Sequence, residues 1–143
     1  MIRKFIRWVK RLVVYDELGD VRAFYEKFGQ HIAPRPALGN PFRVNERINF
    51  MQEELDEFRQ AALSGDLAGQ ADALVDLTYV AKGTALELGL SDCWEVLWQD
   101  VQRANMAKVI GKTHRGINID VAKPLGWKGP TTEEILKEHG YGN

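Results

Sequence analysis

Apolar residues recur at helical spacing along most of the chain, whereas the alternation of polar and apolar residues that marks β-strands is nearly absent. The pattern predicts two long helices, over residues 41 to about 63 and over residues 66–88. Asn40-Pro41 supplies an N-cap and a first helical turn for the first helix, and Ser64-Gly65 supplies its end. Gly89 is the expected stop of the second. Because their connection is short, the two helices are expected to be antiparallel neighbours.

Shorter helices are expected on both sides of this pair. One helix is expected over residues 20–28, with Asp20 as its predicted N-cap. Another is expected from residue 91 through 109 to Gly111, with Ser91 as its predicted N-cap. Both begin at side chains that accept hydrogen bonds from free backbone N–H groups.

The end of the chain has a different pattern. The segment 111–130 is rich in Gly and Lys and has no helical periodicity, so it is expected to form a flap or loop. Thr131 and Glu134 then have capping-box spacing ahead of a last helix, which is expected to stop at Gly140.

These elements predict an all-α fold, an antiparallel helical bundle of about four core helices with a C-terminal flap and short terminal helices. Residues 41–110 are expected to supply three consecutive helices of this bundle. The helix over residues 66–88 is predicted to be its central and most buried member, because apolar side chains cover much of its circumference. These side chains are Leu74, Val75, Leu77, Tyr79, Val80, Ala81, Ala85 and Leu88.

Composition places the chain among folded proteins. With 143 residues it is expected to form one domain over residues 17–143, preceded by a basic amphipathic arm over residues 1–16. A content of 45% hydrophobic and 27% charged residues argues against disorder, and the net charge of −1 gives no global attraction to nucleic acid, so no stable nucleic-acid partner is expected. The single cysteine, Cys93, fits a reducing cytoplasm and excludes a multi-cysteine zinc site.

Residues 1–14 combine five basic residues and no acid with apolar residues at helical spacing. An amphipathic arm that packs on the protein is the favoured interpretation, and contact with a membrane surface or a polyanion is the alternative. The segment lacks the unbroken apolar core and small-residue cleavage site of a secretory signal.

Two acidic clusters stand out, one in each long helix. Glu53, Glu54 and Glu57 share a helical face, and so do Asp72 and Asp76, four residues apart. The second cluster lies in apolar sequence, and neither Lys nor Arg occurs between Arg59 and Lys82 to neutralise it. Since an ionised carboxylate withdrawn from water needs a cation, the two faces predict a divalent metal site.

Oxygen-only ligands favour Mg²⁺ or Mn²⁺ over zinc, because the three histidines lie outside both clusters. A di-iron bundle is disfavoured because Glu-x-x-His is absent. Two alternatives remain open from the residues alone. The three glutamates form a pattern that is more often a solvated helix face, and Asp76 alone would suit a buried structural aspartate.

Asn105 and Lys108 lie almost one turn apart, so they share a helical face. An amide and an ammonium beside a carboxylate-bound metal would suit a polyphosphate. The alternative is equally weighted, because a Lys near a helix C-terminus is favoured by the helix dipole without any ligand.

The order of these motifs resembles a known family. Glu-Glu-x-x-Glu, Asp-Ala-Leu-Val-Asp-Leu-x-Tyr-Val, Gly-Thr-Ala-Leu-Glu-Leu-Gly and Arg-Ala-Asn-Met-Ala-Lys follow one another on successive predicted helices. This combination is similar to the MazG-like all-α nucleoside triphosphate pyrophosphohydrolases, including the phosphoribosyl-ATP pyrophosphohydrolase-like branch often found in phages. The resemblance covers residues 21 to about 135 and leaves out the basic arm.

The resemblance implies hydrolysis of a (deoxy)nucleoside triphosphate between the α- and β-phosphates, giving a monophosphate and pyrophosphate. Mg²⁺ is the implied cofactor, with Mn²⁺ expected to substitute. Glu53 or Glu54 is expected to accept the proton of the attacking water. The implied metal ligands are Glu54, Glu57 and Asp76, with Glu53 as an additional acid and Asp72 as a weaker candidate. Family members often have Glu where this chain has Ala73, so Asp72 is displaced by one residue and is expected to hold a water or a second metal.

The resemblance also assigns the substrate contacts. Asn105 and Lys108 match positions around the phosphates and sugar, Lys123 matches a basic residue of the flap, and Tyr79 is a candidate contact to the sugar or base, with core packing as its alternative. A homodimer or homotetramer is expected, located in the cytoplasm, or in the host cytoplasm if the chain is phage-encoded.

Two rival functions from other classes remain. One is a metal-dependent nucleotide-binding or regulatory module that binds a triphosphate without turnover. The other is a helical protein that docks on a membrane or a partner through residues 1–14.

Overall fold

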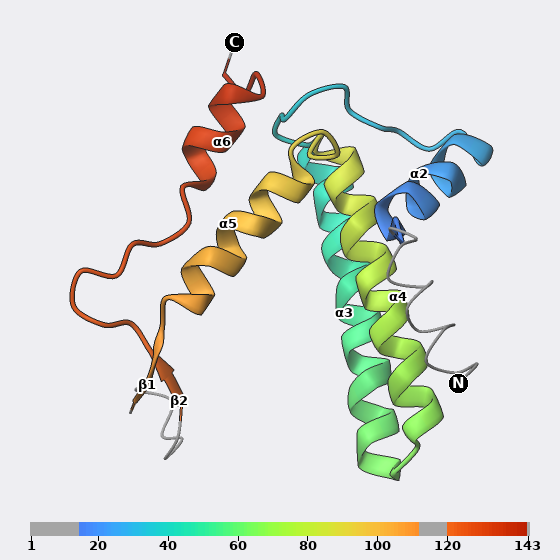
Figure 1. Ribbon diagram of the computed structural model, residues 1–143. Helices are drawn as coiled ribbons and strands as arrows, with labels where there is room; N and C mark the ends of the chain where they lie inside the picture. The colour runs from blue at the N-terminus through green and yellow to red at the C-terminus, as the bar shows by residue number, and fades with distance from the viewer. Residues whose placement is uncertain (1–14, 112–119, 143) are drawn as a thin grey trace, which may run out of the picture. The chain divides into compact units, whose positions relative to one another are not determined.

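The computed structural model describes residues 15–111 and 120–142 (Figure 1). Its described part is mostly helical, with one small two-stranded sheet, which confirms the predicted all-α class. The elements in chain order are α2 (Glu17–Lys27), α3 (Pro41–Ser64), α4 (Leu67–Glu87), α5 (Trp94–Met106), β1 (Val109–Gly111), β2 (Asp120–Ala122) and α6 (Thr132–Glu138).

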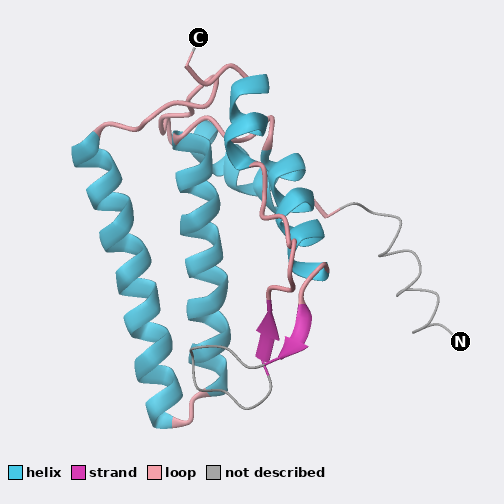
Figure 2. Cartoon of the chain, turned by 90° about the vertical axis from the view of Figure 1, so that its left-hand side faces the viewer, coloured by secondary structure: helices cyan, strands magenta, loops and turns pink. Residues whose placement is uncertain are grey.

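The chain divides into two compact units. One holds α2, α3 and α4, and the other holds the segment 33–39 together with α5, the two strands and α6. Within the first unit, α3 and α4 run side by side in opposite directions (Figures 1 and 2). The antiparallel pairing predicted for the two long helices is therefore confirmed.

The capping residues of the long helices act as the sequence predicts. The Asn40 side chain accepts a hydrogen bond from the Phe42 N–H at 2.9 Å, and Pro41 is the first residue of α3. Gly65 ends the helix with a φ of +70°, a conformation that costs glycine little. Asp66 accepts from the Gly69 N–H at 3.0 Å and so begins α4.

The prediction that Asp20 caps the first helix is wrong. Asp16 takes this role, because its side chain accepts a hydrogen bond from the Gly19 N–H at 2.8 Å, and α2 begins at Glu17. Asp20 instead lies in the first turn of α2, where the helix dipole stabilises a negative charge.

The core of the first unit lies between α2 and the C-terminal half of α4. Val21, Tyr25 and Leu86 form a buried cluster there. Gly83 lies close to it, and a Cβ at this position would come within 2.5 Å of the Tyr25 hydroxyl, so only glycine fits without a shift. The close approach of α2 to α4 therefore depends on Gly83.

The N-terminal half of α4 has exposed apolar side chains. Leu67, Leu74 and Val75 have 77%, 48% and 65% of their surfaces exposed. The helix carries more apolar surface than α2 and α3 cover within this unit, because α2 packs only against its C-terminal half. Since α4 still has more buried residues than any other described helix, the prediction that it is the most buried one is confirmed, although its apolar face is open over this half.

The second unit differs from the sequence prediction at the end of α5. The helix ends at Met106, and Val109 begins strand β1, which pairs with β2 in antiparallel register, Val109 opposite Ala122 (Figure 2). Continuation to Gly111 was the wrong prediction, because Val109 and Ile110 are β-branched and find a partner strand far along the chain. Part of the expected flap thus forms a two-stranded antiparallel sheet, and residues 112–119 lie outside the described residues.

Of the two caps predicted in the second unit, Ser91 is wrong, and Thr131 is the N-cap residue of α6 but makes no capping bond through its side chain. Ser91 lies in a turn, and α5 begins after Cys93, which makes no side-chain capping bond. Thr131 precedes α6 without closing a capping box, because Asp100 accepts hydrogen bonds from both its N–H, at 2.6 Å, and its hydroxyl, at 3.2 Å. This contact joins α6 to α5 instead.

No helix in the described ranges is long and apolar enough to cross a membrane. The predicted basic arm falls almost entirely on residues 1–14, which lie outside the described part of the chain.

Candidate active site

The long-helix hairpin carries one buried carboxylate oxygen without a partner, on a glutamate that is otherwise half-buried. The Oε2 atom of Glu54 on α3 is shielded from solvent, and no described residue donates a hydrogen bond to it. Such an atom is costly to leave unpaired, so it identifies a position where a cation or a donor from outside the described residues is needed.

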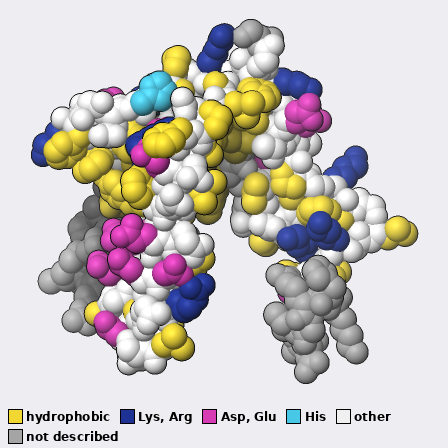
Figure 3. All heavy atoms as spheres, turned by 180° about the vertical axis from the view of Figure 1, so that it is seen from behind, with side chains coloured by type: hydrophobic (Ala, Val, Ile, Leu, Met, Phe, Trp, Pro, Cys, Tyr) yellow, Lys and Arg dark blue, Asp and Glu magenta, His cyan; other side chains and the backbone are white. Residues whose placement is uncertain are grey.

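Four other carboxylates act on Glu54. Burial raises the pKa of Glu54, and the negative charges of Glu57, Asp76, Glu53 and Asp72 raise it further, in that order of effect. The structure therefore brings all five predicted acids of α3 and α4 into one electrostatic neighbourhood, here called the acidic cluster. A group of acidic side chains on the surface of this hairpin is visible in Figure 3.

None of the ion pairs found between described residues includes a member of the acidic cluster. The nearby Arg59 guanidinium is paired with Asp56, which lies outside the cluster. Over the described ranges, no three His, Cys, Asp or Glu side chains converge closely enough to form a ready-made metal site. The orphaned Glu54 oxygen and the unneutralised carboxylates around it nevertheless fit a divalent cation, because oxygen donors are the ligands that Mg²⁺ and Mn²⁺ prefer.

The position of Asp72 agrees with its weaker assignment as a ligand. Ala73, which stands where the resemblance leads one to expect Glu, is only 2% exposed, whereas Asp72 is exposed, as Asp76 is. One residue along a helix corresponds to a rotation of about 100°. Asp72 has the smallest effect of the four acids on Glu54, so Glu57 and Asp76 are the stronger partners of Glu54.

The second unit gathers three of the predicted substrate residues around one indole. Lys108 Nζ donates to Asn105 Oδ1 at 2.8 Å and lies 5.8 Å from the centre of the Trp127 ring, while Lys123 Nζ lies 4.6 Å from that centre. Both distances are within the range of cation–π attraction. Asn105, Lys108, Lys123 and Trp127 are called the lysine cluster below.

The two-stranded sheet and a turn position this cluster. Since Val109 pairs with Ala122, Lys108 and Lys123 flank the same end of the two strands. Gly126, with a φ of +75°, allows the turn that brings the Trp127 N–H to the Pro124 carbonyl, and the Trp127 indole donates to the Ala104 carbonyl at 2.7 Å. Two ammonium groups near one indole offer positive charge and hydrogen-bond donors to an anion such as a phosphate.

Tyr79 lies in the first unit, not in the lysine cluster. Its ring packs edge-on against Phe24, with 5.7 Å between the centroids, and it borders the buried core of α2 and α4. Burial, with a smaller effect from Asp20, raises the pKa of its hydroxyl, so Tyr79 is neutral at physiological pH. Its predicted contact to a sugar or base remains a prediction beside this packing role.

Cys93 is fully buried, and burial raises the pKa of its thiol, as expected for a packing residue rather than a nucleophile.

Sequence reasoning missed Arg47, which is 8% exposed and donates to the Thr84 hydroxyl at 3.1 Å and to the Val80 carbonyl at 2.8 Å. Arg47 thereby fixes α3 against α4 two turns before Glu54. The only sequence signal was its spacing of seven residues from Glu54, which places both on one helical face.

The two long antiparallel helices share the acidic cluster. This arrangement places the protein in the class of the MazG-like all-α proteins. Residues 21–105 match the family model of phosphoribosyl-ATP pyrophosphohydrolase, and the chain belongs to this family. Membership indicates a nucleotide pyrophosphohydrolase-like enzyme. No curated protein matches the chain.

Proposed function

We propose that this protein is a Mg²⁺-dependent nucleotide pyrophosphohydrolase that cleaves a (deoxy)nucleoside triphosphate between the α- and β-phosphates. The products are the monophosphate and pyrophosphate. The observation that carries the proposal is the orphaned Glu54 oxygen amid four further carboxylates, because this arrangement is unfavourable without a bound cation.

In this proposal Glu54, Glu57 and Asp76 hold the metal, with Glu53 and Asp72 beside them. A bound Mg²⁺ supplies charge neutralisation of the phosphates and a more acidic water. Water adds to the α- or the β-phosphorus, the bond from that atom to the oxygen that bridges the two breaks, and the monophosphate and pyrophosphate separate. Glu53 or Glu54 accepts the proton released by the water, and the raised pKa of Glu54 makes that carboxylate a better base near neutral pH.

The lysine cluster is proposed to bind the phosphate chain. Lys108 and Lys123 contribute positive charge, and Asn105, already bonded to Lys108, holds that ammonium in place. The proposal also includes self-association to a homodimer or homotetramer in the cytoplasm. Exposed apolar side chains on α3, such as Phe42 and Leu63, support self-association because a second copy would cover them.

Turnover of a panel of NTPs and dNTPs with Mg²⁺ or Mn²⁺ tests this function, with pyrophosphate and orthophosphate measured separately and the mass in solution measured by light scattering. We expect monophosphate and pyrophosphate in equal amounts, no orthophosphate, and no reaction with EDTA. Metal-dependent nucleotide binding without any turnover would contradict the proposal and favour the regulatory module.

Replacing Lys108 or Lys123 by Met is expected to raise KM for the nucleotide about tenfold or more with little change in kcat. A hydrogen bond to a charged group contributes about 1.5–3 kcal/mol, and the phosphates carry their charge already in the ground state. Steady-state kinetics measures both constants. Lys128→Met is the matched control, because Lys128 is an exposed lysine next to Trp127 but outside the cluster. An unchanged KM in both lysine variants would remove the lysine cluster from the proposed site.

A further inference from the structure

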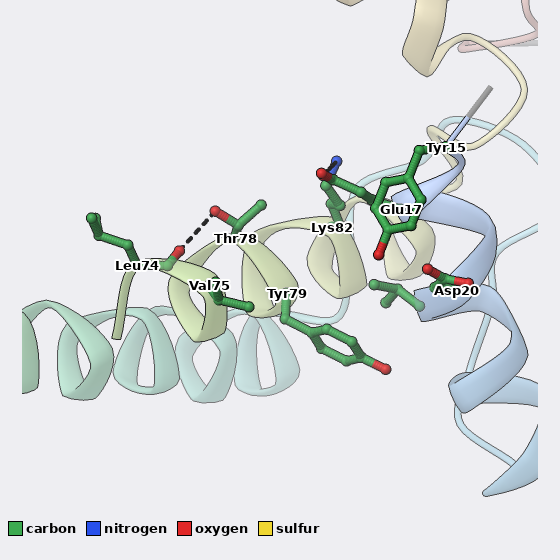
Figure 4. Close-up of a pocket in the computed structure, with 9 residues that line it drawn as sticks. Tyr15, Glu17, Asp20, Leu74, Val75, Thr78, Tyr79 and Lys82 are labelled. Atoms are coloured by element: carbon green, nitrogen blue, oxygen red, sulfur yellow. Dashed lines mark hydrogen bonds and ion pairs between the residues drawn. The ribbon is translucent and has the colours of Figure 1, made fainter. Parts of the chain in front are cut away.

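A pocket of about 560 Å³ lies between the start of α2 and the middle of α4 (Figure 4). No residue of the acidic cluster or the lysine cluster lines it, although Tyr79, the predicted contact to a sugar or base, does. Tyr15, Glu17 and Asp20 line one side, and Leu74, Val75 and Lys82 line the other. Lys82 is paired with Glu17 at 2.9 Å, so this cation is neutralised within the pocket. The same pair neutralises Glu17, so the pocket presents an apolar floor with the Asp20 carboxylate at its margin.

The apolar floor continues along α4 beyond the pocket. The side chains at positions 67, 71, 74, 75, 78 and 82 fall on one helical face by their spacing. All but Lys82 are exposed, including Leu67, Leu74 and Val75. This face, here called the outer stripe, is about 22 Å long, since a helix rises about 1.5 Å per residue. It points away from α3, because the α4 residues that contact α3, Val80 and Thr84, lie on the opposite side.

The segment 1–14 matches the outer stripe in length and position. Fourteen residues span about 21 Å as a helix, and the segment ends directly before Tyr15, which lines the pocket at the Lys82 end of the stripe. The apolar residues Ile2, Phe5, Ile6 and Val9 recur at helical spacing. A helix that starts from Tyr15 and follows α4 in parallel would bring residue 6 to the level of residues 74 and 75.

Charge is complementary as well. The segment carries Arg3, Lys4, Arg7, Lys10 and Arg11 and no acid. From Leu67 to Ala81, α4 carries neither Lys nor Arg, and the Asp20 carboxylate lies at the pocket margin, whereas Glu17 is already paired with Lys82. A basic helix that buries its apolar face on this stripe would meet the Asp20 carboxylate beside the apolar contact.

We infer that the outer stripe of α4 is the docking surface for residues 1–14 of the same chain. The stripe accepts the apolar face of the segment, and the Asp20 carboxylate faces its basic residues. The inference does not depend on the proposed hydrolase activity, because no member of the acidic cluster or the lysine cluster takes part in it.

Disulfide trapping in the full-length chain tests this docking. The variant Ile6→Cys/Val75→Cys is compared with Ile6→Cys/Ile48→Cys, whose second site is an apolar residue of α3 with a similar exposure, 57% against 65%. Cys93 is buried and common to both. We expect the first pair to form an intramolecular disulfide at least tenfold faster, seen as a monomer of increased mobility on a non-reducing gel. Equal rates would overturn the inference, and disulfides mainly between chains would assign the stripe to a second copy instead.

Hydrogen exchange of the otherwise unmodified chain provides a second readout. The amides of residues 2–13 are expected to be protected in the wild type and to lose at least tenfold in protection in Val75→Asp, while the amides of α3 keep theirs. Protection of the segment that appears only when anionic phospholipid vesicles are added would overturn the inference in favour of a membrane contact. Loss of protection throughout α3 would show general unfolding, and the trapping rates would then decide.

Discussion

Asp76→Asn and Glu57→Gln are each expected to lower kcat/KM for nucleotide hydrolysis by at least about a hundredfold. Both substitutions remove one negative charge from the acidic cluster while keeping nearly the same shape. Metal-assisted charge stabilisation contributes several kcal/mol to such a reaction, and each 1.4 kcal/mol corresponds to a tenfold change in rate. Asp76 and Glu57 are also the two acids with the largest effect on Glu54, so their loss should weaken the proposed metal site most.

A control on the same helix separates metal binding from general loss of charge. Asp56→Asn removes an exposed carboxylate next to Glu57, but Asp56 is paired with Arg59 and bonded to Gln52 rather than directed at Glu54. This variant should retain activity within a fewfold. Titration of Mn²⁺ followed by electron paramagnetic resonance should show weaker binding for the two site variants only. Activity retained by both site variants would contradict the assignment of Glu57 and Asp76.

Asp72→Asn offers a graded comparison with these variants. Asp72 has the weakest electrostatic effect on Glu54 of the four acids. We therefore expect a smaller loss of activity than for Asp76→Asn, measured under the same metal concentrations. A loss as large as that of Asp76→Asn would make Asp72 a ligand of equal importance.

The parts of the fold that could be predicted from the sequence are those with local causes. Asn40, Gly65 and Asp66 fix the ends of α3 and α4 through bonds to residues two to four positions away, so short stretches of sequence contain the required signal. The end of α5 could not be predicted this way. Val109 leaves the helix because Ala122 pairs with it, and that partner is separated by 13 residues of sequence.

In the candidate site, too, the sequence predicts local arrangements but not contacts between distant segments. Helical spacing alone placed Glu54 and Glu57 on one face and Asp72 and Asp76 on another, and the structure brings both faces together. Spacing gave no indication that Trp127 lies between Lys108 and Lys123, because this contact depends on the two-stranded sheet and on the Gly126 turn. Arg47 was missed because a lone arginine in a polar helix is typical of a surface, and only tertiary packing reveals its burial.

Glu54→Gln is expected to abolish turnover and at the same time to stabilise the metal-free protein at pH 7. Activity should fall at least about a hundredfold, because a proposed ligand and proton acceptor loses its charge. Tm should rise by a few degrees in EDTA, because the substitution removes a carboxylate that burial and four neighbouring charges disfavour in its ionised form. Differential scanning calorimetry and the turnover assay measure the two effects on the same preparation.

The pH dependence of this stabilisation follows from the raised pKa of Glu54. The pKa of Glu54 is higher in the folded than in the unfolded state. The carboxyl group therefore contributes its full share of stability while it is protonated in both states. This contribution is lost as the pH rises through the folded-state pKa. Glutamine does not titrate, so the Tm advantage of Glu54→Gln should be largest at neutral pH and disappear as the pH falls below the usual pKa of a glutamate. Mg²⁺ should reverse the order at pH 7, because a metal that binds only the folded wild type stabilises it by mass action. A lower Tm for Glu54→Gln in EDTA at pH 7 would mean that the acidic cluster is already neutralised without a cation. Glu54 would then need no metal, and the proposed metal site would be contradicted.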